Sequence, residues 1–155
     1  MKKMLRFFSL LFVAIPLSCS SAGSSSVQST SNIYDIIDRQ SISLADCLSQ
    51  PENHYVVYFY SDTCASCQRI KESVVTFANS SVVKTYFLDT QKPENNIQKC
   101  SIDELIVGVN NVSDLYIAGT PTLLEVKDGV TVSNVGGEIN CLDLLETFAI
   151  NAKAD

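Results

Sequence analysis

A change of hydrophobic pattern at residues 64–67 is the feature that most limits how this chain can fold. Residues 54–61, HYVVYFYS, are β-branched and aromatic without polar alternation, which predicts a strand buried on both faces of a sheet. After Cys67 the apolar residues follow helical spacing, at Ile70, Val74, Val75, Phe77 and Ala78. The motif Cys64-Ala65-Ser66-Cys67 therefore lies where a central strand ends and a helix begins.

The remaining segments alternate between strand and helix patterns, and Asp128-Gly129 predicts a tight hairpin turn. The order β-α-β-α-β-α-β-β-α predicts one α/β domain with helices on both sides of its sheet. Strands are expected at 33–37, 82–90, 120–126 and 130–135, and helices at 44–48, after the capping box at 101–104, and at 141–149.

The first 22 residues have the pattern of a secretory signal. Lys2, Lys3 and Arg6 give a basic start, and the apolar run over 5–17 is shorter than the roughly 20 residues that a membrane-spanning helix needs. Removal of these three basic residues reduces Lys and Arg from 11 to 8 against 17 Asp and Glu, a net charge of −9. Because such a domain repels nucleic acid and anionic lipid headgroups, we exclude nucleic-acid binding.

The signal can be cut at two positions. Ser18-Cys19 resembles the end of a bacterial lipobox, in which the cysteine becomes the lipid-modified first residue, although Pro16 stands where Leu is usual. A small-x-small cut after Ala22 is the alternative, and Cys19 then belongs to a discarded peptide. The serine-rich residues 23–32 favour the lipid anchor, because an anchored domain needs a tether. We expect a domain over 33–155, outside the cytoplasm, anchored through Cys19 on the outer face of the cell membrane or else secreted.

Three features together resemble the thioredoxin superfamily over residues 33 to about 150: the buried strand leading into Cys64-Ala65-Ser66-Cys67, the segment GTPTLLEVKDG, and the pair Gly136-Gly137 before the last helix. The chain looks most like membrane-attached thioredoxin-like proteins of Gram-positive bacteria. The resemblance implies a thioredoxin fold, with a central mixed β-sheet flanked by helices. We expect no cofactor. The resemblance also implies a cis bond between Thr120 and Pro121, which exposes the preceding backbone to a bound substrate chain.

The sequence departs from the cytoplasmic thioredoxin pattern at several positions. Thr63 stands in place of Trp, Ala65-Ser66 in place of Gly-Pro, and Tyr58 in place of a buried Asp. The segment 90–119 is longer than in the minimal fold and contains Cys100. Substrate identity and redox direction therefore do not carry over from the family.

The chemistry expected of the pair follows from thiol reactivity. A thiolate attacks a disulfide, and free N–H groups at a helix N-terminus stabilise the charge that Cys64 then carries. Cys67, in the first turn, is expected to resolve the mixed disulfide. Arg69 either assists Cys64 or is a solubilising surface charge. A purely structural disulfide between Cys64 and Cys67 would close too small a loop to stabilise the fold much. A zinc site needs about four ligands, and His54 is the only histidine in the chain.

The sequence does not decide the role of three further cysteines, Cys47, Cys100 and Cys141. A disulfide between two of them is one interpretation outside the cytoplasm, and small buried hydrophobic residues are the other.

These observations predict an extracytoplasmic thiol-disulfide oxidoreductase that acts on exported cysteine-containing proteins. Cys64 and Cys67 are its expected catalytic residues, Thr120 and Pro121 its expected substrate-binding residues, and a membrane or extracytoplasmic redox partner restores the pair. Membrane contact is expected through the lipid anchor alone. The alternative is a redox-inert binding module of the cell envelope that uses the groove beside Pro121. A metal carrier would need further thiol ligands from a partner.

Overall fold

The computed structural model describes residues 35–80, 82–101 and 107–154. The predicted signal, Cys19, the tether at 23–32 and the helix expected after the capping box lie outside the described residues. Within the described ranges, no helix combines the length and the apolar character that crossing a membrane requires.

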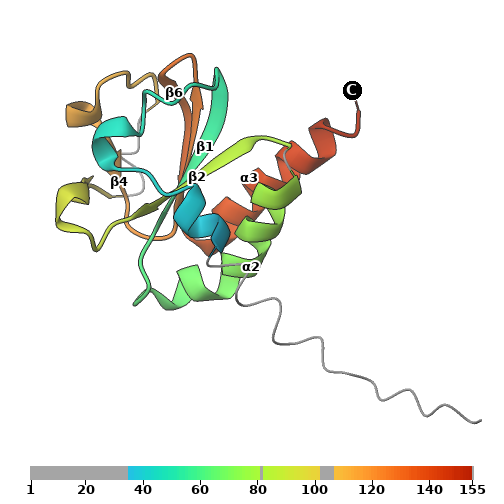
Figure 1. Ribbon diagram of the computed structural model, residues 1–155, viewed down its shortest axis with the longest axis horizontal. Coiled ribbons are helices and arrows are strands. Elements are labelled where there is room, and N and C mark those ends of the chain that lie inside the picture. The colour runs from blue at the N-terminus through green and yellow to red at the C-terminus, as the bar shows by residue number, and fades with distance from the viewer. Residues whose placement is uncertain (1–34, 81, 102–106, 155) are drawn as a thin grey trace, which may run out of the picture.

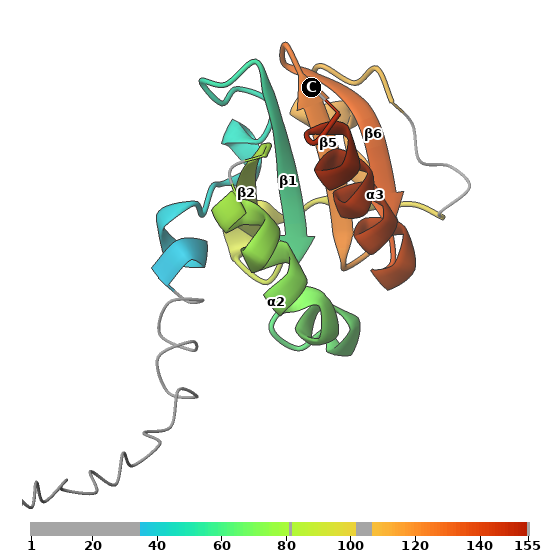
Figure 2. The same cartoon turned by 90° about the vertical axis from the view of Figure 1, so that its right-hand side faces the viewer.

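A four-stranded mixed sheet forms the centre of the molecule (Figures 1 and 2). The central strand β1 is parallel to β2 and antiparallel to β5, and β5 is antiparallel to β6, so that the strand order is β2-β1-β5-β6. This central position explains the unbroken apolar run, because both faces of β1 are covered. The strands are β1 His54–Tyr60, β2 Lys84–Asp89, β5 Thr122–Lys127 and β6 Val130–Gly136.

Two long helices, α2 Ala65–Ser80 and α3 Glu138–Asn151, cover one face of this sheet (Figure 2). Their apolar sides bury a cluster together with alternate residues of the strands. Its main members are Val56, Tyr58, Ile70, Val74, Val75, Phe77, Phe87, Leu123, Cys141, Leu145 and Phe148. This packing fixes the start of each helix relative to the end of β1.

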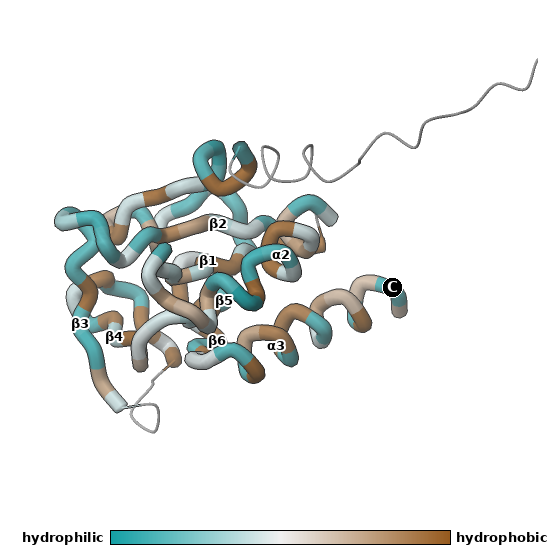
Figure 3. Tube along the Cα trace, turned by 90° about the horizontal axis from the view of Figure 1, so that it is seen from below, coloured by the Kyte–Doolittle hydropathy of each residue, from teal (hydrophilic) through white to brown (hydrophobic). Residues whose placement is uncertain are grey.

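The opposite face is covered by 3₁₀ turns and a small parallel two-stranded sheet (Figure 3). The turns are η1 Leu44–Asp46, η2 Pro93–Asn95 and η4 Val112–Asp114, and the small sheet pairs β3 Gln98–Lys99 with β4 Tyr116–Ile117. These segments bury the other set of alternate strand residues, including Tyr55, Val57, Phe59, Leu88, Leu124 and Val126. Sequence patterns did not predict the small sheet.

The first described element is a correction. Residues 35–39 are helical, so the strand expected at 33–37 is wrong over its described part. Ile36 and Ile37 are buried while Asp35 and Asp38 are exposed, which places the apolar pair on one helix face. The apolar character of Ile36 and Ile37 therefore reflects one buried helix face.

Two segments outside the four-stranded sheet, residues 40–42 and 108–109, hydrogen-bond to its outer strands. On β2, Phe87 donates its N–H to Gln40 O and accepts from Ile42 N, both at 2.9 Å. On β6, Thr131 accepts from Gly108 N at 2.7 Å and donates to Val109 O at 2.9 Å.

The C-terminal half mostly follows the prediction. Asp128 and Gly129 have φ of 51° and 76°, which confirms the tight turn between β5 and β6. Strand β5 begins at Thr122, two residues later than expected, because Pro121 precedes the ladder. Helix α3 begins at Glu138, three residues earlier than the predicted start.

Candidate active site

The loop between β1 and α2 places Cys64 immediately before the helix. Its N–H donates to Ser61 O at 3.1 Å, and its carbonyl accepts from Gln68 N at 3.1 Å as the first helical bond. The buried Ser61 also hydrogen-bonds Thr63 through the two hydroxyl groups, at 2.9 Å. These bonds fix the thiol at the N-terminus of α2, where backbone N–H groups point outward.

The Cys64 sulfur has two close partners. It accepts the backbone N–H of Cys67 at 3.2 Å, and its thiol donates to Thr120 O at 3.2 Å. Partial burial is the largest influence and raises the pKa of Cys64, whereas hydrogen bonds with Cys67, Thr120 and Ser66 lower it. The balance is a pKa below the ordinary cysteine value, which favours the thiolate.

Cys67 has the opposite environment. Its side chain is only 4% exposed, and burial together with the hydrogen bond to Cys64 raises the pKa of Cys67 to about 11. The half-buried Cys64 is therefore the first sulfur of the pair to ionise as pH rises, and Cys67 stays protonated near neutral pH.

Thr120 and Pro121 lie beside this sulfur, as the sequence predicted. Their peptide bond is cis, and Pro121 O accepts the N–H of Gly137 at 2.8 Å, which joins the loop to the start of α3. The two residues line an open groove with Cys100, Ser101, Ala118, Gly119, Gly136 and Gly137. Cys100 is half-buried and lines this groove, a position that its spacing in the sequence did not indicate.

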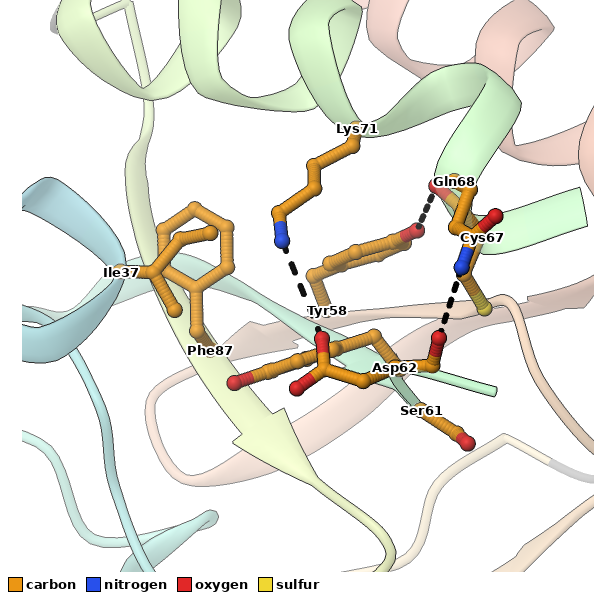
Figure 4. Close-up of a pocket in the computed structure, with 9 residues that line it drawn as sticks. Ile37, Tyr58, Ser61, Asp62, Cys67, Gln68, Lys71 and Phe87 are labelled. Carbon is orange, nitrogen blue, oxygen red and sulfur yellow. Dashed lines mark hydrogen bonds and ion pairs between the residues drawn. The ribbon is translucent and has the colours of Figure 1, made fainter. Parts of the chain in front are cut away.

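A pocket lies behind Cys67, at the end of β1 and beneath α2 (Figure 4). Tyr58 occupies it in place of the acid of the thioredoxin pattern, and its hydroxyl donates to Cys67 O at 3.5 Å. Lys71 Nζ and Asp62 Oδ1 lie 3.8 Å apart at the same pocket. Because burial raises the pKa of Tyr58 far above its usual value, this hydroxyl stays protonated and supplies no base to Cys67.

Arg69 is held in an ion pair that the sequence did not indicate. Its Nε and Nη2 lie 2.8 and 2.7 Å from Glu138 Oε2, and Nη2 donates to Ser66 Oγ at 2.9 Å. Glu138 is the first residue of α3, where acidic residues are favoured by the helix dipole. That preference was visible in the sequence, but the partner on α2 was not.

The two other described cysteines are buried thiols. Cys47 and Cys141 are fully buried in separate clusters on opposite faces of the sheet, so a disulfide between these two is excluded. Burial raises the pKa of each thiol to about 12. The five cysteines within the described ranges are all free thiols, and Cys47 and Cys141 act as small hydrophobic residues.

His54 lies at the opposite end of β1 from the cysteine pair. Its Nε2 is 2.9 Å from Glu125 Oε1, and Lys127 Nζ is 2.9 Å from the same oxygen. Among the described residues, no group of three His, Cys, Asp or Glu side chains is placed to hold a metal ion.

Comparisons with known proteins agree with this geometry. The thioredoxin family model matches residues 38–149. No curated protein matches the chain. Among solved structures, mitochondrial thioredoxin 3 from Saccharomyces cerevisiae has a TM-score of 0.52 at 16% identity, covering 76% of this chain and 97% of its own. Thioredoxin from Malassezia sympodialis gives 0.51 at 18% identity, covering 73% and 90%. Spinach chloroplast thioredoxin f gives 0.50 at 16% identity, covering 77% and 94%.

These structures confirm the predicted fold, a central mixed sheet flanked by helices. The family match covers most of the described chain, including the cysteine pair, the cis proline and the start of α3. The chain therefore belongs to the thioredoxin family and is a thioredoxin-like thiol-disulfide oxidoreductase with the motif Cys64-Ala65-Ser66-Cys67.

Proposed function

We propose that this protein exchanges disulfides with exported cysteine-containing proteins outside the cytoplasm, with Cys64 as the nucleophile and Cys67 as the resolving thiol. The observation that carries the assignment is the contrast between the two sulfurs. Cys64 is half-buried and accepts the N–H of Cys67 at 3.2 Å, whereas Cys67 is 4% exposed and protonated near neutral pH. One sulfur is prepared to attack and the other is shielded until the first step has occurred.

The reaction proceeds in two exchanges. The Cys64 thiolate attacks a substrate disulfide, so that a mixed disulfide forms and the departing substrate sulfur takes up a proton. Cys67 then loses its proton and attacks the Cys64 sulfur, which closes the protein disulfide and releases the second substrate thiol. The same steps in reverse oxidise a substrate dithiol. A membrane or extracytoplasmic redox partner returns the pair to its starting state.

The groove beside Thr120 and Pro121 is the proposed substrate site. It opens near Cys64, because Thr120 lines it and the Thr120 carbonyl oxygen is 3.2 Å from the Cys64 sulfur. A substrate chain along this groove has its disulfide within reach of Cys64. A redox-inert binding module would use the same groove, but it would have no need for two thiols of such different environments.

The proposed location rests on the sequence of the N-terminal region. The basic start, the short apolar run and the serine-rich residues 23–32 support export and a lipid anchor at Cys19. On this proposal the protein is one of the membrane-attached thioredoxin-like proteins of Gram-positive bacteria. Labelled fatty acid should enter the full-length protein in a bacterial host and be lost in Cys19→Ala. Release of an unlabelled chain beginning near Gly23 would instead indicate ordinary secretion.

A trapping experiment tests the catalytic assignment. In the full-length protein, Cys67→Ala should accumulate mixed disulfides with envelope proteins, because the resolving thiol is gone. Mass mapping should place each bond at Cys64, and Cys100→Ser, added as a matched control in the groove, should leave the bonds there. Complexes formed through Cys100 or Cys141 would overturn the assignment.

A further inference from the structure

A charged bridge spans the start of α2 and the start of α3 beside the reactive sulfur. The Arg69 guanidinium contacts Glu138 Oε2 through two nitrogens and also donates to Ser66, which lies between the two cysteines. Glu138 is also tied to the groove, since its neighbour Gly137 donates its N–H to Pro121 O at 2.8 Å. Arg69 is thus held against the cysteine motif by a carboxylate from another helix.

The position of this bridge matters because the charge of Cys64 changes with its redox state. In the dithiol form Cys64 is the first sulfur to become a thiolate, because its pKa is lowered, whereas neither sulfur of the disulfide form carries charge. A nearby cation therefore stabilises the dithiol form, and a nearby anion opposes that stabilisation. The Cys64 thiolate and the Arg69 guanidinium interact electrostatically, since the Cys64 charge contributes to the raised pKa of Arg69 after the larger contributions of Glu138.

Other ionisable groups around the pair have different arrangements. Asp62, before Cys64, lies 3.8 Å from Lys71 on α2, and both line the pocket behind Cys67. Tyr58 on β1 and Cys141 on α3 are buried, and burial raises the pKa of both, so they stay neutral near pH 7. Among these described groups, Arg69 and Glu138 form the ion pair that contacts the cysteine motif itself, through Ser66.

We propose that Glu138 tunes the redox equilibrium of the Cys64–Cys67 pair by weakening the stabilisation that Arg69 gives to the Cys64 thiolate, an inference that rests on the proposed redox function of this pair. Glu138 is a positioning residue that acts through Arg69. The paired charges hold the protein at an intermediate oxidising strength. Arg69 alone would make it more oxidising, and Glu138 alone would make it more reducing.

Equilibration with glutathione measures this tuning. Cys64 and Cys67 lose two electrons and form one S–S bond, while the S–S bond of oxidised glutathione breaks and gives two glutathione thiols. The two protons that those thiols need come from Cys67 and from Cys64, or from solvent where Cys64 is already a thiolate. The apparent pKa of Cys64 is measured separately, from the pH dependence of its alkylation.

The two single variants should have opposite effects on the Cys64 pKa and opposite effects on the equilibrium with glutathione. Arg69→Met should raise the Cys64 pKa and make oxidation of the pair easier, by about two- to fivefold in the equilibrium constant, as the attraction of an exposed charge implies. Glu138→Gln keeps an oxygen that accepts from the guanidinium, so it should lower the Cys64 pKa and make oxidation harder by a similar factor. The double variant Arg69→Met/Glu138→Gln should lie near the natural protein.

Matched controls separate this effect from net charge. Lys153→Met and Glu146→Gln make the same charge changes farther along the chain from the motif, and neither should shift the equilibrium. The shifts of Arg69→Met and Glu138→Gln should shrink in high salt. Shifts of the same sign in both variants, or no shift in either, would overturn the tuning. A pair that does not equilibrate with glutathione in any variant would instead overturn the proposed function.

Discussion

The polar side chains near the two ends of β1 have contrasting environments, one open to solvent and one enclosed. At one end the chain continues into Cys64, whose sulfur is half-buried, accepts an N–H at 3.2 Å and borders an open groove. At the other end His54 and Lys127 each lie 2.9 Å from the same oxygen of Glu125, which is only 8% exposed. The Cys64 sulfur has a lowered pKa and stays accessible, whereas the Glu125 carboxylate is enclosed by its partners.

This difference shows how local geometry leaves one polar group open to reaction and encloses another. A sulfur at a helix N-terminus receives N–H groups without being covered, because those donors have no partners within the helix. A carboxylate in the middle of a sheet must be matched by cations to be buried at all. Reactivity should therefore respond to changes at one end of β1 only.

The largest expected effect contrasts Cys64→Ser with Glu125→Gln. Cys64→Ser should reduce insulin disulfide reduction to the background rate, because a serine hydroxyl does not replace the thiolate. Glu125→Gln keeps an acceptor for His54 and should leave the rate unchanged. Both rates are measured on the full-length protein with the same reductant. Activity that survives in Cys64→Ser would contradict the contrast.

A large effect on stability is expected at alkaline pH in the reduced protein. Cys47, Cys67 and Cys141 have folded pKa values raised to about 12, 11 and 12, so their stabilising contribution is complete below the unfolded pKa of about 8.5. It is lost as pH rises toward the folded values, since the unfolded thiols release their protons first. The free energy of unfolding should fall by up to about 1.4 kcal/mol per pH unit for each thiol between pH 9 and 10.

Urea denaturation at several pH values under reducing conditions measures this loss. Cys141→Ala should show a shallower decline than the natural protein, because one of the buried thiols is absent. Cys64 should behave differently, since its folded pKa is lowered and its contribution is lost as pH falls through that value. A free energy of unfolding that stays constant from pH 8 to 10 would contradict the burial of the three thiols.

A smaller effect is expected from His54→Ala, at the far end of β1. Loss of the 2.9 Å contact to Glu125 should cost about 1 kcal/mol of stability, as a partly exposed hydrogen bond to a carboxylate does. The alkylation rate of Cys64 should not change. Lys127→Met serves as the companion variant, because it removes the lysine that contacts the same Glu125 oxygen. An altered Cys64 rate in either variant would show that the two ends of β1 are coupled.

The smallest effect is expected from Tyr58→Phe. The lost hydroxyl donates to Cys67 O across 3.5 Å, a long hydrogen bond, so the cost in stability should be below about 1 kcal/mol. Cys67 should still resolve mixed disulfides at the natural rate, because the hydroxyl is not a base. Quenched-flow trapping of the mixed disulfide measures that rate. A clear slowing would assign Tyr58 a part in the second step.

Much of the fold followed from local patterns. The buried run of β1, the helical spacing after Cys67 and the Asp128-Gly129 turn each reflect short-range chemistry, and the structure contains all three. The helix at 35–39 was misread because Ile36 and Ile37 are adjacent, and two adjacent apolar residues fit a strand and a helix face equally well. Strands β3 and β4 have two residues each, too few for a periodic signal.

The site was predictable in its parts but not in its contacts. Cys64, Cys67, Thr120 and Pro121 were recognised from their sequence context, and the structure brings all four together. The Arg69–Glu138 contact joins residues 69 positions apart, a separation over which a single sequence carries no pairing signal. The approach of Cys100 to the groove depends on the β3–β4 pairing, which was itself not predicted.

The segments that pair with the outer strands have a consequence for how the protein behaves among neighbouring molecules. An uncovered edge of a sheet is a template on which a second chain can add as another strand. Here Phe87 on β2 and Thr131 on β6 have their outward backbone groups engaged by residues 40–42 and 108–109. A neighbouring molecule must displace these segments before it can extend the sheet there. The fold thereby limits edge-to-edge pairing at these positions, whereas the groove beside Thr120 and Pro121 stays open.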